Sequence, residues 1–149
     1  MQSPDDQTRA RKAWLGLLAR SPADRVSALC PDLPEHDVLR PAEIGTVMVR
    51  GRAGATGDAF NLGEMTVTRC SVRLASGTVG HGYVQGRDRS HARKVAVLDA
   101  LMQGDRAEEI RSAVLDPLAR EAADRRSVRA GRAAGTRVDF FTMVRGEDA

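Results

Sequence analysis

Two arginines lie beside the predicted start of a helix, where an anion could bind. Residues 78–102 read as a strand, a polar turn and a helix, and Arg87 and Arg89 flank Asp88 in the turn. Asp88 is a good N-cap, because its carboxylate can accept hydrogen bonds from free N–H groups of the first helical turn. Those N–H groups and the positive dipole end favour an anion, and two guanidinium groups add donors suited to phosphate or phosphonate oxygens. The alternative interpretation is an ordinary capped turn at the surface.

The histidines and cysteines do not show the spacing of a metal site. His91 falls on the apolar side of the predicted helix, where a half-buried, hydrogen-bonded imidazole is a more common arrangement than a catalytic base. His81, on the preceding strand, could approach it in space. No HExxH or CxxC pattern is present, and Cys30 and Cys70 are far apart in the sequence. We therefore expect no metal and two free thiols.

Three further arginines lie in the region of predicted strands. Arg52 belongs to the run 51–57, GRAGATG, whose three glycines could form a backbone nest for an anion or simply a hairpin loop. It is not a P-loop, because the GxxxxGK[ST] lysine is absent. Arg69 and Arg73 share one face of the predicted strand 60–74, about 13 Å apart at ~3.3 Å per residue. The candidates for substrate or anion binding are Arg52, Arg69, Arg73, Arg87, Arg89 and His91.

The strand and helix that carry the first turn should pack closely together. In residues 78–85 the large side chains point to one face, and Gly80 and Gly82 leave the other face bare, so that a helix can approach it. The helix should run from about 88 to 103, with Gly104 placed to end it. Its apolar stripe is spaced four, three and four residues apart, at His91, Val95, Leu98 and Met102. Its outer side is predicted to carry Arg93, Lys94 and Asp99.

Length and pattern predict a single α+β domain over residues 1–149, an antiparallel β-meander packed with helices. An N-terminal helical pair should span 3–30 and the strands 37–86. Helices should follow over 88–134, with a break before Pro117. An extended tail at 137–149 completes the chain.

Composition points away from nucleic acid and membranes. The formal net charge of +3 is only mildly basic, and aromatics make up 3% of residues, so stacking platforms interleaved with basic side chains are missing. No segment reaches the ~20 apolar residues of a membrane span. The first residues lack the apolar run of a signal peptide, and we expect a cytoplasmic protein.

The tail is apolar on both faces. Val138 and Phe140 alternate with Phe141 and Met143, so that covering both sides of an extended segment takes more than one surface. We therefore predict that Val138, Phe140, Phe141 and Met143 dock on a partner. The alternative is that the tail folds back as an edge strand over its own core.

Taken together, these motifs resemble a known family. The RAGATG loop, the TVTR strand, the GRDRSHA turn, DALMQ and the terminal DFFTMVRG are similar to the G subunit of bacterial carbon–phosphorus lyase, almost from end to end. The loop has Ala55 where the family pattern has glycine. The matched motif covers Arg52, Gly54, Gly57, Thr68, Arg69, Arg73, Gly86, Arg87, Asp88 and His91.

This resemblance implies a supporting role in phosphonate degradation. The G subunit acts with sister subunits H, I and L to replace the adenine of Mg-ATP with an alkylphosphonate, giving ribose 1-alkylphosphonate 5-triphosphate. The chemistry of that step is credited to the I subunit, and carbon–phosphorus cleavage to the J subunit. The resemblance therefore implies that this chain binds no cofactor of its own, with the I subunit as its most direct partner.

Two hypotheses of different class follow. The chain is either an obligate, non-catalytic subunit of such a complex or a free-standing anion- or nucleotide-binding module. Oligomeric state separates them, because only the second predicts a stable monomer that binds ATP or phosphonate by itself.

Overall fold

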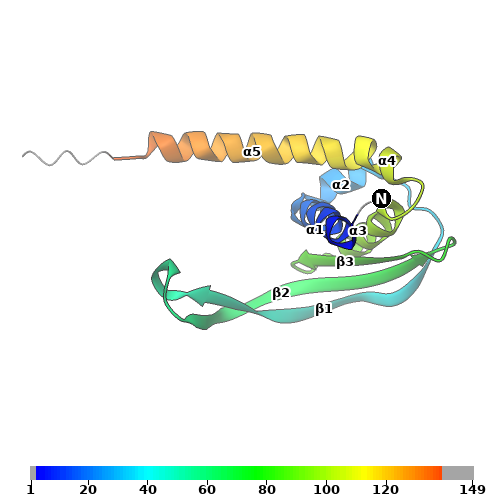
Figure 1. Ribbon diagram of the computed structural model, residues 1–149, viewed down its shortest axis with the longest axis horizontal. Helices are drawn as coiled ribbons and strands as arrows, with labels where there is room; N and C mark the ends of the chain where they lie inside the picture. The colour runs from blue at the N-terminus through cyan, green and yellow to red at the C-terminus, as the bar shows by residue number, and fades with distance from the viewer. Residues whose placement is uncertain (1–2, 139–149) are drawn as a thin grey trace, which may run out of the picture.

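The computed structural model describes residues 3–138 and shows a helical layer against a small sheet (Figure 1). Helices α1 (Pro4–Arg20) and α2 (Ala23–Leu29) come first. The strands are β1 (His36–Arg52), β2 (Ala59–Leu74) and β3 (Val79–Gln85), with a 3₁₀ turn at Ala53–Ala55. The remaining helices are α3 (Arg89–Met102), α4 (Ala107–Ile110) and α5 (Asp116–Gly135), with a π-helical turn (Arg111–Leu115) before α5.

The sheet is an antiparallel meander in the order β1-β2-β3, which confirms the predicted α+β class. Strand β3 is much shorter than its neighbours, and the last pair it forms with β2 is Val67 with Gln85. Apart from a hydrogen bond from the backbone N–H of Gly86 to the carbonyl of Thr66 (2.9 Å), residues 46–66 of β1, β2 and the turn between them therefore pair only with each other. They form a two-stranded ribbon that projects from the body, and we call it the hairpin arm (Figure 1).

Helix α3 packs backbone against backbone on the bare face of β3. A Cβ built at Gly80 would overlap the carbonyl oxygen of Ala96, and one at Gly82 would overlap that of Ala92. This confirms the expectation from the glycine face. The predicted apolar stripe of α3 is buried throughout, and the core around it also takes in Leu18, Val26, Val72, Val84, Val114 and Leu118.

The prediction that Asp99 lies on the outer side of α3 is wrong. Its side chain is fully buried, because α1 packs beside α3 at the free edge of β3. Its carboxylate accepts hydrogen bonds from Arg11 (Nε 3.1 Å, Nη2 2.7 Å), from Trp14 Nε1 (2.9 Å) and from the backbone N–H of His81 (2.9 Å). One carboxylate therefore joins α1, α3 and an edge strand that would otherwise offer an unpaired donor.

The predicted boundary before Pro117 is confirmed, because the π-helical turn ends at Leu115 and α5 begins at Asp116. The chain does not break there, because the backbone stays helical through Leu115 (φ −70°, ψ −44°) and Asp116 (φ −64°, ψ −45°). Proline cannot donate to the carbonyl four residues earlier, so the hydrogen-bond ladder must change near it. The π-helical turn Arg111–Leu115 takes up that change without ending the helix.

Helix α5 continues well beyond the body. Leu118 is buried in the core, whereas every residue from 123 to 135 is exposed. We call residues 123–135 the helical arm. It extends in the same direction as the hairpin arm (Figure 1). No helix within residues 3–138 is long and apolar enough to cross a bilayer. Of the predicted docking residues, Val138 is 68% exposed, and Phe140, Phe141 and Met143 lie outside the described residues.

Candidate functional site

The turn before α3 is built as the sequence predicts. The Asp88 carboxylate accepts from the backbone N–H of His91 at 2.8 Å, which confirms the N-cap. Gly86 has φ 93°, a left-handed value that favours glycine, and its carbonyl accepts from Thr68 Oγ1 at 2.7 Å. The turn is therefore held against β2, and Arg87 and Arg89 are exposed on it.

His91 lies beneath this turn. Its side chain is only 7% exposed, and neither ring nitrogen makes a hydrogen bond within the described part of the chain. The expectation of a half-buried imidazole is therefore wrong, and in place of the expected hydrogen bond the ring has only a weak interaction with the backbone of Ala19. Burial lowers the pKa of His91 below its ordinary 6.5, and Asp88 and the backbone of Ala19 oppose that shift more weakly. The imidazole is thus kept neutral and apart from the exposed arginines.

Arg69 and Arg73 share the outer face of the sheet, on the side away from α3. Both are exposed, whereas Thr68, Cys70 and Val72 are buried on the inner face. Arg73 Nη2 lies 3.3 Å from the carboxylate of Asp37. Arg69 is paired in register with Tyr83 on one side and Glu43 on the other. On the outer face, Arg73 therefore lies beside its own carboxylate, whereas Glu43 opposite Arg69 pairs with Arg40 at 3.3 Å.

A serine–histidine pair also lies on the outer face. Ser71 Oγ is 2.8 Å from His81 Nδ1, and the pair is solvent-accessible. Within residues 3–138 no carboxylate binds the other ring nitrogen of His81, so the pair lacks the third group that orients a catalytic base. His81 and His91 lie on opposite sides of the sheet and do not converge. The described residues contain no group of three or more His, Cys, Asp or Glu side chains that could hold a metal ion.

Arg52 lies at the tip of the hairpin arm. Its Nη1 donates to the carbonyl of Gly57 at 3.4 Å, and the 3₁₀ turn that follows has left-handed Gly54 (φ 58°) and Ala55 (φ 64°). Arg52 is seven residues beyond Gly45, the last β1 position in the three-stranded part, or about 23 Å at ~3.3 Å per residue. The candidate arginines thus occupy three places: the hairpin tip, the outer face and the turn before α3.

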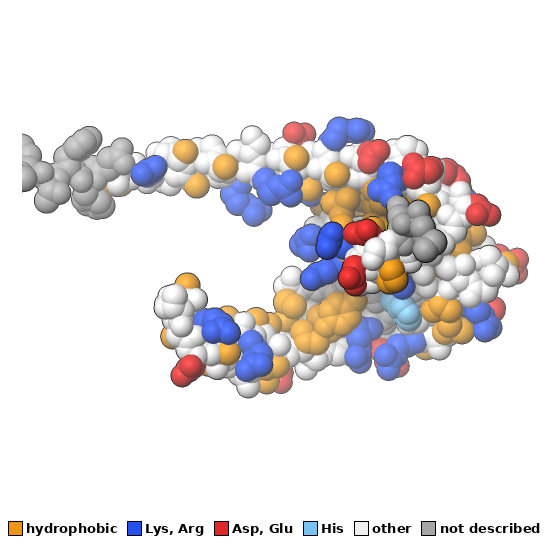
Figure 2. All heavy atoms as spheres, viewed as in Figure 1, with side chains coloured by type: hydrophobic (Ala, Val, Ile, Leu, Met, Phe, Trp, Pro, Cys, Tyr) orange, Lys and Arg blue, Asp and Glu red, His pale blue; other side chains and the backbone are white. Residues whose placement is uncertain are grey.

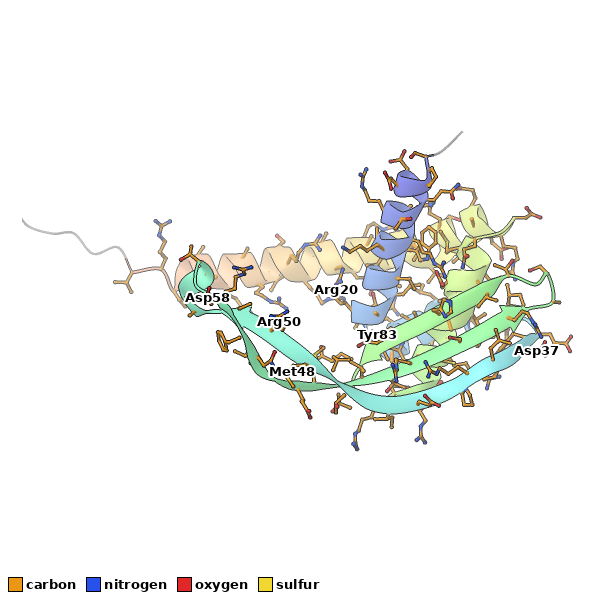
Figure 3. The ribbon with its side chains drawn as sticks, turned by 60° about the horizontal axis from the view of Figure 1, so that its bottom comes forward. Arg20, Asp37, Met48, Arg50, Asp58 and Tyr83 are labelled. Carbon is orange, nitrogen blue, oxygen red and sulfur yellow. The ribbon has the colours of Figure 1, made fainter. Side chains whose placement is uncertain are left out.

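Sequence reasoning missed the cleft between the two arms. Figure 2 shows the molecule as a C-shape, hollowed between the arms. A groove of ≈ 810 Å³ along the exposed face of α1 is lined by Lys12, Leu15, Gly16, Arg20 and Tyr83, among others. Arg20, Tyr83 and, on the hairpin, Arg50 border the gap in Figure 3. Only the lengths of the strands and of α5 could have predicted the cleft, because it forms where these elements extend beyond the packed body.

Comparison with known proteins decides the family. A family model described as "Phosphonate metabolism protein PhnG" matches residues 9–146. The chain belongs to the PhnG family. It is also 45% identical over 151 aligned residues to the "Alpha-D-ribose 1-methylphosphonate 5-triphosphate synthase subunit PhnG" of Rhizobium meliloti (strain 1021), an alignment that covers 98% of this chain and 96% of the relative. The resemblance to the G subunit is thus confirmed. The PhnG match spans all six candidate binding residues, whose roles stay predictions.

Proposed function

We propose that the chain is a supporting subunit of an alkylphosphonate-ribosylating complex. In that complex, alkylphosphonate displaces adenine from ATP to give ribose 1-alkylphosphonate 5-triphosphate. The likeness to a synthase subunit over nearly the full length of both chains carries this proposal. The partners are sister subunits H, I, J and L, with I in direct contact. Mg-ATP and phosphonate bind at the level of the complex rather than to this chain as its own cofactor.

The use of the buried polar groups supports a non-catalytic role. Asp99 is the one fully buried carboxylate among residues 3–138. It accepts four hydrogen bonds from Arg11, Trp14 and His81 and a longer one from Gln103 (3.5 Å), so no acceptor site on it is left for a substrate. His91 is neutral and enclosed. The exposed Ser71–His81 pair lies on an open sheet face that does not exclude water. None of these three groups is arranged to act on a substrate, and we assign the glycosidic step to a sister subunit.

The exposed arginines give the subunit a second contribution. Arg87 and Arg89 flank a helix N-terminus, where positive charge would attract the anionic substrates of the complex. If they do so, Arg87→Ala with Arg89→Ala should weaken substrate binding by the intact assembly, with little change in fold. Unchanged kinetics of that double variant would leave the turn a structural element only.

The test compares three preparations for adenine release from Mg-ATP and methylphosphonate: the isolated chain, the co-purified assembly, and the sister subunits without this chain. We expect release from the complete assembly alone. Release by the isolated chain at the rate of the assembly would contradict the supporting role. A stable monomer that binds ATP or methylphosphonate by itself would instead indicate a free-standing binding module.

A further inference from the structure

The cleft between the arms carries charge that the chain itself does not neutralise. The helical arm holds four arginines and one aspartate in residues 123–135. At about 100° per residue, Arg125, Arg129 and Arg132 lie within about 40° of the direction of Leu118 around the helix axis. Leu118 points into the core. The side of α5 that packs on the body therefore carries, beyond the end of the body, a row of arginines that faces the cleft.

Figure 2 agrees with this placement, because basic side chains hang from α5 over the hollow between the arms. Across the hollow, the floor and the opposite wall add Lys12, Arg20 and Arg50. Among residues 3–138, none of these six cations lies within ion-pair distance of a carboxylate; Arg125 acts on Glu121 only from a longer range, and Glu121 is itself bonded to Arg25. Unpaired positive charge on the walls of one concavity favours an anionic occupant.

The floor of the cleft is apolar, which restricts what that occupant can be. Tyr83 is 48% exposed there, beside the half-buried Leu15 and Ala19 of α1. An occupant that matches floor and walls needs apolar side chains on one face and carboxylates on its flanks. An amphipathic helix with acidic flanks meets both needs, because its apolar stripe and its charged sides are separated around one axis. A phosphodiester backbone has no apolar face to present.

Within residues 3–138, little of the chain packs against the two arms. A two-stranded ribbon is marginally stable in water by itself, and the hairpin arm exposes Met48 (53%), Phe60 (45%) and Leu62 (65%). The helical arm has no buried residue and contains Gly131, which costs about 1 kcal/mol relative to alanine within a helix. Both arms would be stabilised by a segment lying between them.

We propose that this cleft binds an acidic, amphipathic helix of a sister subunit, with its apolar face on Tyr83 and Leu15 and its carboxylates against the arginine row. The inference rests on the proposed function, because it presupposes that the chain assembles with sister subunits. It adds the surface and the chemistry of the segment that this surface takes.

Chemical cross-linking can locate the segment, because the chain has only two lysines. Lys12 lines the cleft, whereas Lys94 donates to Ser27 at 3.1 Å and is a matched control. A zero-length carbodiimide joins a lysine amine to a carboxylate directly. In the co-purified assembly we expect an amide between Lys12 and an Asp or Glu of a sister subunit, lost in Lys12→Arg. The cross-linked partner peptide should be acidic and amphipathic.

A second experiment measures affinity for the sister subunits. It compares the double variant Arg125→Gln plus Arg129→Gln with the double variant Arg106→Gln plus Arg111→Gln. The second pair removes the same charge from exposed positions near α4, at the end of the molecule away from the cleft. We expect the cleft variant alone to weaken association with the sister subunits by about tenfold or more and to reduce its salt dependence. Helical circular dichroism of each variant should match the wild type.

The outcomes separate the two proposals. If the wild-type chain does not associate with the sister subunits at all, the proposed function fails. If it associates, but the cleft variant binds as tightly as the control, or Lys12 couples to a second copy of this chain, the cleft inference is overturned. Displacement of the sister subunits from the wild type by a short nucleic acid, with no carboxylate coupled to Lys12, would overturn it in favour of a nucleic-acid site.

Discussion

The body of the molecule and its two arms differ in what covers them. In the body, α3 lies so close to β3 that Gly80 and Gly82 have no room for a methyl group, and the buried carboxylate of Asp99 is fully bonded. In the arms, the strands and the helix carry apolar and cationic side chains that are exposed to solvent. The body therefore carries the stability of the fold, and the arms extend surfaces suited to another chain.

The largest effect should come from filling the contact between β3 and α3. Gly80→Ala places a methyl group against the carbonyl of Ala96, and a helix backbone cannot move away as a flexible side chain can. We expect a loss of at least about 3 kcal/mol in the free energy of unfolding, measured in urea. Gly45→Ala is the matched control, because nothing lies within 4 Å of its Cβ position. Equal stability of both variants would show that the body is not closely packed here.

Removal of the buried carboxylate should have the next largest effect. Asp99→Ala leaves the N–H groups of Trp14 and His81 and the guanidinium of Arg11 without their acceptor. Because Arg11 is partly exposed and can turn to water, we expect about 2–3 kcal/mol rather than the full cost of a broken buried ion pair. Thermal unfolding of Asp99→Ala against Asp6→Ala, which breaks an exposed ion pair, measures the difference. A loss no larger than that of Asp6→Ala would contradict the role of Asp99.

Acid should destabilise the body through His91. Its pKa is lower in the folded chain than the ordinary 6.5, so the unfolded chain binds the proton more readily. The contribution is fully present above pH 6.5 and is lost as the pH falls from there through the lower folded pKa. Urea unfolding of the wild type and His91→Gln should show a steeper loss for the wild type over that window. Parallel pH profiles would mean that the imidazole titrates as if it were exposed.

The smallest effect on the isolated chain should come from the arms. Leu62→Ser removes a side chain that is 65% exposed, and we expect it to change the free energy of unfolding by less than about 0.5 kcal/mol. Leu98→Ala, in the core, should cost about 2–5 kcal/mol by comparison. The same Leu62→Ser variant should weaken association with the sister subunits. A large loss of stability in the isolated chain would show that the arm belongs to the body.

Local patterns in the sequence predicted most of the body. The alternation of glycine with large residues in β3, the Asp88 cap and the apolar stripe of α3 each depend on neighbours in the sequence, and all three are confirmed. Asp99 was misplaced because its burial depends on α1, some 88 residues away in the sequence. The helical periodicity predicts that a charged residue is exposed. It cannot reveal that an arginine and a tryptophan far away in the sequence will bind the carboxylate of Asp99.

The sequence predicted the positions of only some of the candidate binding residues. Strand period correctly placed Arg69 and Arg73 on one face, and the cap placed Arg87 and Arg89 on an exposed turn. The sequence could not show that Arg52 lies on a separate ribbon, about 23 Å from the three-stranded part of the sheet. That position follows from the unequal lengths of β1, β2 and β3. The sequence could not show which way the arginine row of α5 faces, because that direction is fixed by where Leu118 meets the core.

Amide hydrogen exchange tests the central claim most directly, namely that the body is self-sufficient and the arms are covered by a partner. Exchange is compared, peptide by peptide, between the isolated chain and the co-purified assembly. The account predicts slow exchange in β3 and α3 in both states, and fast exchange in residues 46–66 and 123–135 that slows strongly on assembly. Arms that exchange at the same rate in both states, while protection appears only on the body, would contradict it.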